Sequence, residues 1–248
     1  MRSHAPVSVV IPAHNEESVL PNTLDSLLVQ SRPPKEIIVV NNASTDQTGI
    51  VANRYKEKFT AQKSLFVVLT EPRLGIAYAR NAGFRKATQP IIASTDSDTI
   101  VAPDWIARIV RHFKNHASVA VVGRIVMSDA PPFIRRLTQL GYIGGYFKLG
   151  RLLLGFHPLS TANCGVRKDA FDQTNGFDPR IKDPDGLDDV YLAGQLSLLG
   201  TITYDHTIIV GSSFRRYQSF SRFFHSTIRR YRAAWHIRKN HRKQRKTH

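Results

Sequence analysis

The feature that most constrains this chain is an alternation of short apolar runs with segments of helical spacing. The runs cover residues 7–11, 36–40, 65–69 and 90–94, and they are rich in valine and isoleucine. Between the first two runs, apolar residues recur at three- and four-residue steps, which is the period of a helix. Strands that alternate with helices predict an α/β fold with a mostly parallel central sheet, whose ligands bind beyond the carboxyl ends of the strands.

The remainder of the chain has a weaker pattern. Residues 105–112 and 188–199 have helical spacing, and residues 119–126, 201–204 and 208–210 predict strands. Residues 127–160 are rich in glycine and predict no regular element. Within them, residues 137–159 contain Lys148, Arg151 and five glycines, so they fall short of the roughly 20 apolar residues that span a membrane. This stretch could instead lie in a membrane interface or close over a substrate.

Basic charge is concentrated at the C-terminal end. The chain carries a formal charge of +16, yet residues 212–248 hold twelve Lys or Arg and no acid, which leaves +4 for residues 1–211. Aromatic and apolar residues recur from Phe214 to Trp235 at helical steps. We therefore expect a folded domain over 1–211, followed by a basic amphipathic helix and tail over 212–248. Such a helix suits an anionic membrane surface or packs on the domain; nucleic-acid binding requires only charge and is the less specific interpretation.

Two carboxylates follow the fourth apolar run. Asp96 and Asp98 are one residue apart, and side chains two positions apart in an extended strand point to the same side. Carboxylate oxygens are ligands that Mg²⁺ and Mn²⁺ accept, with phosphate oxygens and water completing the shell. This position predicts a divalent-cation site, whereas an isolated Asp-x-Asp is usually a solvated turn.

Three further polar clusters occur where a ligand crevice is expected. Residues 12–17 and 41–46 follow the first two runs, although Ser44 or Asp46 could instead cap the next helix. Arg73 and Arg80 are seven residues apart and share a helix face, which suits a diphosphate or simply faces solvent. Adjacent Asp188 and Asp189 begin a helix, where they could act as caps or supply a general base.

Taken in order, these segments resemble family 2 glycosyltransferases of the GT-A fold. The shared segments are Val-Ile-Pro-Ala-His-Asn-Glu-Glu at 10–17, Val-Val-Asn-Asn-Ala-Ser-Thr-Asp at 39–46, Arg-x-Gly-x-Ala-x-Ala-Arg-Asn-x-Gly at 73–83 and Asp-Ser-Asp at 96–98. Residues 161–171 are similar to the acceptor-side segment of the family, and Asp188-Asp189 to its Glu-Asp pair. The resemblance covers about residues 7–216.

The resemblance implies a role for each matched residue. Asp98, assisted by Asp96, would bind Mg²⁺ or Mn²⁺, and Asp189, paired with Asp188, would deprotonate the acceptor hydroxyl. Residues near the diphosphate and donor sugar would be Arg73, Gly75, Arg80 and Asn81. Asn163 and Arg167 would lie on the acceptor side. The nucleotide pocket would be lined by Pro12, Ala13, Asn15, Glu16, Asn41, Asn42, Ser44 and Asp46.

The implied activity is inverting transfer of one sugar from a nucleotide-sugar donor, UDP-linked in the leading interpretation, to a hydroxyl acceptor. A lipid-linked acceptor in cell-envelope glycan synthesis would place the enzyme in the cytoplasm, at the membrane face. The frequent Asp-Asp-Gly-Ser of the family is Asn41-Asn-Ala-Ser44 here, and the Gln-x-x-Arg-Trp of processive synthases is absent. The alternatives are a non-catalytic nucleic-acid- or membrane-binding protein on a degenerate GT-A fold, and a nucleotidyltransferase. The latter usually has a glycine-rich loop after its first strand, and residues 12–20 contain no glycine.

Overall fold

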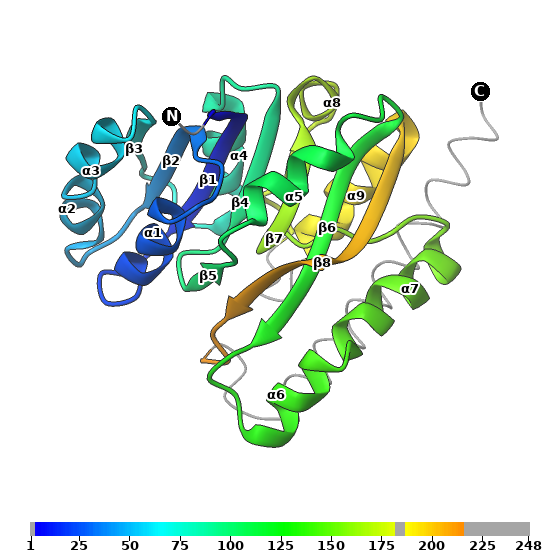
Figure 1. The fold of residues 1–248 in the computed structure, drawn as a ribbon. Helices are drawn as coiled ribbons and strands as arrows, with labels where there is room; N and C mark the ends of the chain where they lie inside the picture. Colours follow the sequence, from blue (N-terminus) through cyan, green and yellow to red (C-terminus); the bar gives the residue numbers. More distant parts are fainter. Residues whose placement is uncertain (1–2, 182–186, 216–248) are drawn as a thin grey trace.

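One eight-stranded sheet organises the chain in the computed structural model, which describes residues 3–181 and 187–215 (Figure 1). Its strand order is β3-β2-β1-β4-β7-β6-β8-β5. The first four strands along the chain are mutually parallel and correspond to the four apolar runs: β1 (Ala5–Ala13), β2 (Pro34–Asn42), β3 (Leu65–Glu71) and β4 (Ile91–Thr95). The predicted α/β fold is thereby confirmed.

Helices cover both faces of this sheet, which explains why its central strands are apolar on both sides. Val9 and Ile11 of β1 pack toward α1 (Leu20–Leu28), α2 (Thr48–Asn53), α3 (Lys56–Ala61) and α5 (Trp105–His112). The alternate residue Val10 packs toward the opposite face, with α4 (Ile76–Lys86), α8 (Lys168–Asp172) and α9 (Leu187–Leu199). A strand that is buried on both faces is typically a nearly continuous apolar run, rich in valine, isoleucine and leucine.

The other half of the sheet is mixed. β7 (Asn163–Arg167) lies antiparallel between β4 and β6 (Ser118–Met127), a strand that the sequence pattern did not predict. β8 (Thr201–Ser212) is one strand where two short ones were expected, and it pairs with β6 in parallel and with β5 (Thr99–Val101) antiparallel. Its register shifts opposite Gly123 and Arg124, which explains the break in the apolar pattern.

Two helices replace the irregular stretch expected over residues 127–160. α6 (Pro132–Gln139) and α7 (Tyr142–Leu154) extend along one edge of the molecule (Figure 1). Two of the glycines that suggested a loop are packing positions. A Cβ at Gly144 would lie 2.8 Å from the Tyr204 hydroxyl, and one at Gly150 would lie 2.6 Å from Pro158.

The expected basic helix cannot be compared with the structure beyond residue 215, because residues 216–248 lie outside the described ranges. Within residues 3–181 and 187–215, no helix has the length and apolar content to cross a membrane.

Candidate active site

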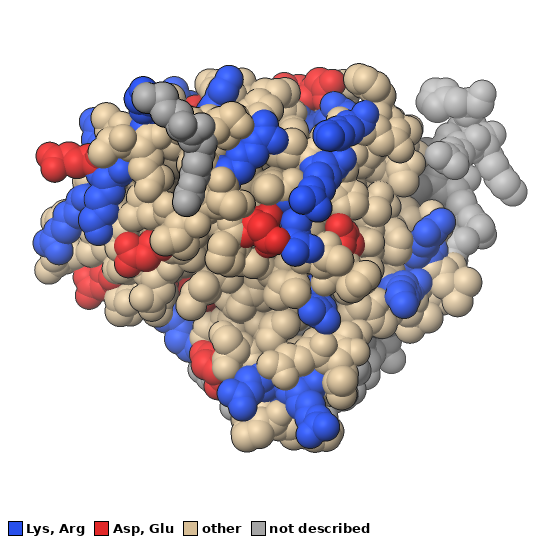
Figure 2. Space-filling view, in the orientation of Figure 1, with Lys and Arg blue, Asp and Glu red and all other residues tan. Residues whose placement is uncertain are grey.

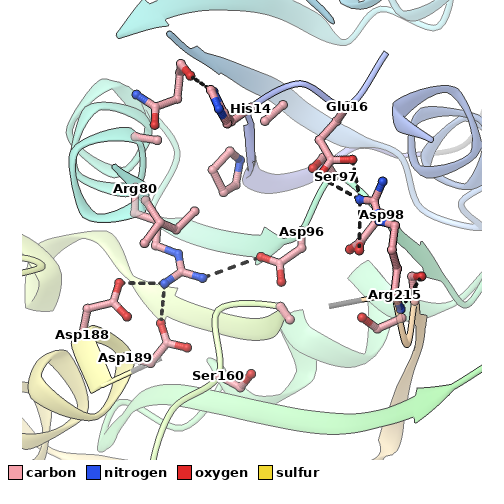
Figure 3. A pocket seen from close by; sticks show the side chains of 18 of the residues that line it. His14, Glu16, Arg80, Asp96, Ser97, Asp98, Ser160, Asp188, Asp189 and Arg215 are labelled. Carbon is pink, nitrogen blue, oxygen red and sulfur yellow. Dashed lines mark hydrogen bonds and ion pairs between the residues drawn. The ribbon is translucent and has the colours of Figure 1, made fainter. Parts of the chain in front are cut away.

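A cavity of about 630 Å³ opens beside the carboxyl ends of β1, β2 and β4, the edge at which the sequence placed the ligand (Figure 3). Residues from α9 and from the end of β8 form its other side. The structure brings together here ten of the residues predicted for the site: Pro12, Ala13, Glu16, Asn42, Gly75, Arg80, Asp96, Asp98, Asp188 and Asp189.

Asp96 and Asp98 come directly after β4, and both line the cavity. The Asp98 side chain is 18% exposed. Burial, followed by the negative charges of Asp96 and Glu16, raises the pKa of Asp98 to about 6. The excess of negative charge at this end of the cavity is the electrostatic situation that a bound cation relieves.

Arg80 connects this end of the cavity to the opposite one. Its Nη1 donates to Asp188 Oδ2 at 2.7 Å and to Asp189 Oδ1 at 3.1 Å, while Nη2 lies 3.7 Å from Asp96 Oδ1 (Figure 3). Burial opposes the charged form of Arg80, but Asp189, Asp188 and Asp96 raise its pKa above the ordinary value. The side chain is therefore a fixed cation between two pairs of carboxylates.

The position of Arg80 depends on how closely α4 packs on the sheet. Gly83, one turn further along α4, faces β1 and β2. A Cβ on it would lie 2.4 Å from Val10 and 3.0 Å from Val40, so a larger residue would push the helix outward. Close packing of α4 on the sheet therefore explains why residue 83 is a glycine.

Asp189 is held on its other side by Thr161. The Thr161 hydroxyl donates to Asp189 Oδ1 at 2.9 Å, and its backbone N–H donates to Oδ2 at 3.2 Å. Asp188 differs, since its Oδ1 is buried with no hydrogen-bond partner among the described residues. Two adjacent carboxylates thus have distinct surroundings, and both line the cavity.

A second arginine, Arg215, reaches the cavity from the turn after β8. Its Nη2 donates to Glu16 Oε2 at 2.6 Å and Oε1 at 2.9 Å, and lies 3.8 Å from Asp98 Oδ2. The pairing with Glu16 raises the pKa of Arg215. Nothing local to Arg215 in the sequence indicates that its ion-pair partner lies 199 residues away.

The residues around Asp98 fit a hard divalent cation. Asp96 and Asp98 provide oxygen ligands. The pKa of Asp98 is raised mainly by burial and then by the charges of Asp96 and Glu16, while Arg215 lowers it. Among the described residues, no group of three or more His, Cys, Asp or Glu side chains is arranged to hold a metal. A metal would therefore need further ligands, such as phosphate oxygens and water.

The polar loops after β1 and β2 are joined to each other. Asn15 Oδ1 accepts from the backbone N–H of Thr45 at 2.8 Å, and Ser44 Oγ accepts from that of Asn15. Asp46 accepts from the N–H of Thr48, the first residue of α2, although the N-cap position itself is Gln47. Asn15, Ser44 and Asp46 support the rim and do not line the cavity itself.

Asn42 lines the cavity, but its amide is already bonded. Its Nδ2 donates to the carbonyls of Glu71 and Arg73, and its Oδ1 accepts from the N–H of Gly75. Gly75 has φ of +144°, a conformation that favours glycine, where the chain enters α4. Asn42 therefore shapes the turn that begins α4.

Four other predicted site residues, Asn41, Arg73, Asn81 and Arg167, do not line the cavity. Arg73 pairs with Glu71, and this pairing lowers the pKa of Glu71 to about 2. Asn81 exchanges two hydrogen bonds with the backbone of Phe177. Arg167 donates to the backbone carbonyls of Phe113, which follows α5, and Ser118, which begins β6.

Asn163 also differs from the acceptor-side expectation. It is fully buried, accepts from Trp105 Nε1 at 2.8 Å and donates to two backbone carbonyls, so its polar groups are bonded within the protein. The acceptor-side segment instead contributes Ala162 to the cavity and the contact of Thr161 to Asp189, and Ser160, just before the segment, also lines the cavity.

Residues 8–174 match the family model described as "Glycosyl transferase family 2". The chain is 28% identical over 191 residues to the probable glycosyltransferase YdaM of Bacillus subtilis (strain 168), which covers 73% of this chain. The chain spans only 44% of the length of that relative.

Solved structures show the same fold. The mannosyltransferase PcManGT from Pyrobaculum calidifontis, in complex with GDP-Man and Mn²⁺, matches with a TM-score of 0.68 and 20% identity over 94% of this chain and 70% of that one. S. aureus TarS 1–349, in complex with UDP-GlcNAc, matches with a TM-score of 0.65 and 20% identity over 86% of this chain and 58% of that one. At such identity the likeness establishes the GT-A fold.

Proposed function

The chain belongs to glycosyltransferase family 2, and from that membership we propose that it transfers one sugar from a nucleotide-sugar donor to a hydroxyl acceptor, with inversion. The observation that carries the proposal is the single cavity with carboxylates at both ends. Asp96 and Asp98 lie at one end and Asp188 and Asp189 at the other, with Arg80 between them. Because the two pairs of carboxylates are separated, the leaving diphosphate can bind at Asp96 and Asp98 while Asp189 accepts the proton at the other end.

The end formed by Asp96 and Asp98 takes the donor diphosphate. Asp98, assisted by Asp96, would hold Mg²⁺ or Mn²⁺ there, since both are oxygen ligands next to excess negative charge. A bound divalent ion neutralises the charge that develops on the departing nucleoside diphosphate. Pro12, Ala13, Glu16 and Asn42 would contact the nucleotide along the ends of β1 and β2.

The end formed by Asp188 and Asp189 takes the acceptor. We assign Asp189 as the general base: Thr161 and Arg80 fix its orientation, and it lines the cavity. A base must lie within hydrogen-bond reach of the proton it removes, and a carboxylate held by two partners meets that condition when the acceptor binds beside it. Asp188 keeps Arg80 in place through the shorter contact.

The reaction then balances in one displacement. The acceptor oxygen forms a bond to the anomeric carbon while the bond from that carbon to the phosphate oxygen breaks. The hydroxyl proton passes to Asp189, and the electron pair leaves with the nucleoside diphosphate. Attack from the side opposite the leaving group inverts the anomeric configuration.

We propose a UDP-sugar as the donor and a GDP-sugar as its main competitor. Relatives in structure bind both kinds, since TarS is in complex with UDP-GlcNAc and PcManGT with GDP-Man. Asn41-Asn-Ala-Ser44 replaces the family's frequent Asp-Asp-Gly-Ser, a segment that usually contacts the base and ribose of uridine. This replacement is the reason to test a GDP-sugar beside the UDP-sugar.

A membrane-bound acceptor is consistent with the surface of α6 and α7. Leu140 is 77% and Leu152 is 76% exposed. Around them lie the exposed cations Arg135, Arg136, Lys148 and Arg151, and no acidic residue occurs between Asp129 and Asp169. Figure 2 shows Lys and Arg side chains gathered at the lower end of the molecule, around α6. Apolar side chains flanked by cations suit an anionic lipid surface, so we propose peripheral contact with the membrane and a lipid-linked acceptor.

The proposal is tested by incubating the purified chain with UDP-, GDP-, dTDP- and CDP-sugars and Mn²⁺, with and without a lipid-extract acceptor. Release of one nucleoside diphosphate, abolished by EDTA, is the expected result, and the NMR coupling at the anomeric position of the product reports inversion. Retention of configuration would contradict the assigned mechanism. The absence of release from every donor would favour the non-catalytic alternative.

A further inference from the structure

Arg215 forms an ion pair at the place where the donor diphosphate is proposed to bind. Its guanidinium is bonded to both oxygens of Glu16 and lies 3.8 Å from Asp98 (Figure 3). The carboxylate side chains are each 18% exposed, whereas that of Arg215 is 51% exposed. The cation therefore approaches two largely buried carboxylates from the solvent side.

The two arginines of the cavity differ in their freedom to move. Arg80 has a side chain that is 5% exposed and contacts three carboxylates, so it is fixed. Arg215 extends from a turn that Asp129 holds by accepting from Ser213 Oγ and from the N–H of Phe214. Its backbone is anchored while its half-exposed side chain can change partner without unpacking the core.

The charges around Asp98 make the position of Arg215 matter for a metal. A divalent ion on Asp98 would face the Arg215 guanidinium at short range, and like charges this close repel strongly in a partly buried site. A diphosphate between them removes the conflict, because its oxygens can bind the metal on one side and accept hydrogen bonds from the guanidinium on the other. Glu16, Asp98 and Arg215 together therefore favour a bound metal only when a diphosphate binds with it.

We propose that Arg215 makes metal binding at Asp98 conditional on the nucleoside diphosphate. In the free protein Arg215 pairs with Glu16 and Asp98 and opposes the metal. When a nucleoside diphosphate enters, Arg215 turns to a phosphate oxygen and leaves Asp98 to the metal. This inference rests on the proposed donor site, and it adds a repulsion from Arg215 in the free protein to the need of a metal at Asp98 for phosphate ligands.

The test compares the full chain with its Arg215→Gln variant. Mn²⁺ binding is measured from the EPR signal of the free ion, first alone and then with saturating UDP or GDP, whichever the protein binds. UDP or GDP binding is measured by calorimetry in the presence of Mn²⁺. We expect the variant to bind Mn²⁺ alone at least threefold more tightly and the nucleotide at least tenfold more weakly. A simple loss of charge or fold would not move the two affinities in opposite directions.

Arg108→Gln is the matched control, because Arg108 forms a partly exposed ion pair with Asp104 and does not line the cavity. It should leave both affinities unchanged. If the wild-type chain binds Mn²⁺ with nucleotide and Arg215→Gln leaves its affinity for Mn²⁺ alone unchanged or weaker, the role of Arg215 is refuted while the donor site stands. If the wild-type chain binds no Mn²⁺ even with nucleotide, the metal site of the proposed function fails, and this inference fails with it.

Discussion

The guanidinium of Arg80 lies 2.7 Å from the carboxylate of Asp188, and this contact joins two elements that are 108 residues apart in sequence. Both side chains are almost fully buried, at 5% and 2% exposure. Because Arg80 also contacts Asp189 and Asp96, it holds the carboxylates of both ends of the cavity in one arrangement. The geometry of the site therefore depends on one buried cation.

Replacing Arg80 by Met should lower the free energy of unfolding by about 3–5 kcal/mol, because it leaves buried carboxylates without a counter-charge. Urea denaturation measures the loss. Arg108→Met, which breaks a partly exposed ion pair at the start of α5, should cost less than about 1 kcal/mol. A similar small cost for both substitutions would show that the buried pairs do not hold the site together.

Asp189→Asn should lower kcat by a factor of about 10² to 10⁴, because the substitution removes the proton acceptor of the proposed reaction. Donor affinity should change less than about twofold, since the diphosphate lies at the other end of the cavity. Single-turnover kinetics and calorimetry separate the two effects. Asp172→Asn, on the exposed side of α8, serves as the control. Turnover near the wild-type value would exclude Asp189 as the base.

Metal-dependent donor binding should weaken as the pH falls through 6. The pKa of Asp98 is raised to about 6 by burial and by the charges of Asp96 and Glu16, so below that pH a proton occupies the carboxylate that the metal needs. Affinity for the metal should fall about tenfold per pH unit below 6 and level off above 7. Calorimetric titration from pH 5 to 8 measures this. Asp98→Asn should bind the metal weakly at every pH. If this variant instead keeps the pH dependence of the wild-type chain, a group other than Asp98 is responsible for the titration.

Leu152→Glu should reduce sedimentation of the full chain with vesicles of phosphatidylglycerol and phosphatidylcholine by at least threefold. The substitution places a negative charge on the exposed surface of α7 proposed to face anionic lipid. Leu198→Glu, at a position of α9 that is 50% exposed, is the matched control and should not reduce binding. If both variants lose the same amount of vesicle binding, or neither loses any, the proposed contact of α7 with the membrane is wrong.

The parallel half of the fold and the acidic end of the site could be predicted from sequence because both depend on local patterns. A short run rich in valine and isoleucine predicts a strand such as β1, and a carboxylate directly after a strand predicts the position of Asp96. Neither needs knowledge of distant contacts. The bounds of α6 and α7 could not be predicted, because Gly144 and Gly150 suit loops locally and only the close approach of Tyr204 and Pro158 explains them.

The roles of individual polar residues were harder to predict, since a ligand contact and a structural hydrogen bond require the same side chain. Asn163 fits an acceptor-side motif, yet it bonds to Trp105, which is 58 residues away. Arg80 was expected near the diphosphate, and its nearest partners are Asp188 and Asp189. Motif position identifies which residues gather at the cavity, whereas the three-dimensional packing decides what each of them contacts.

The most direct test of the central claim is a thermal-shift measurement of the full chain and its Asp98→Asn variant with UDP- and GDP-sugars, each with and without Mn²⁺. A ligand at about 100 times its dissociation constant adds about 2.7 kcal/mol to the free energy of unfolding, which is a readily measured rise in Tm. The account predicts that one nucleotide sugar raises the Tm of the wild-type chain only when Mn²⁺ is present, and that Asp98→Asn loses this rise. A wild-type chain that is folded and shows no manganese-dependent rise with either donor would contradict it.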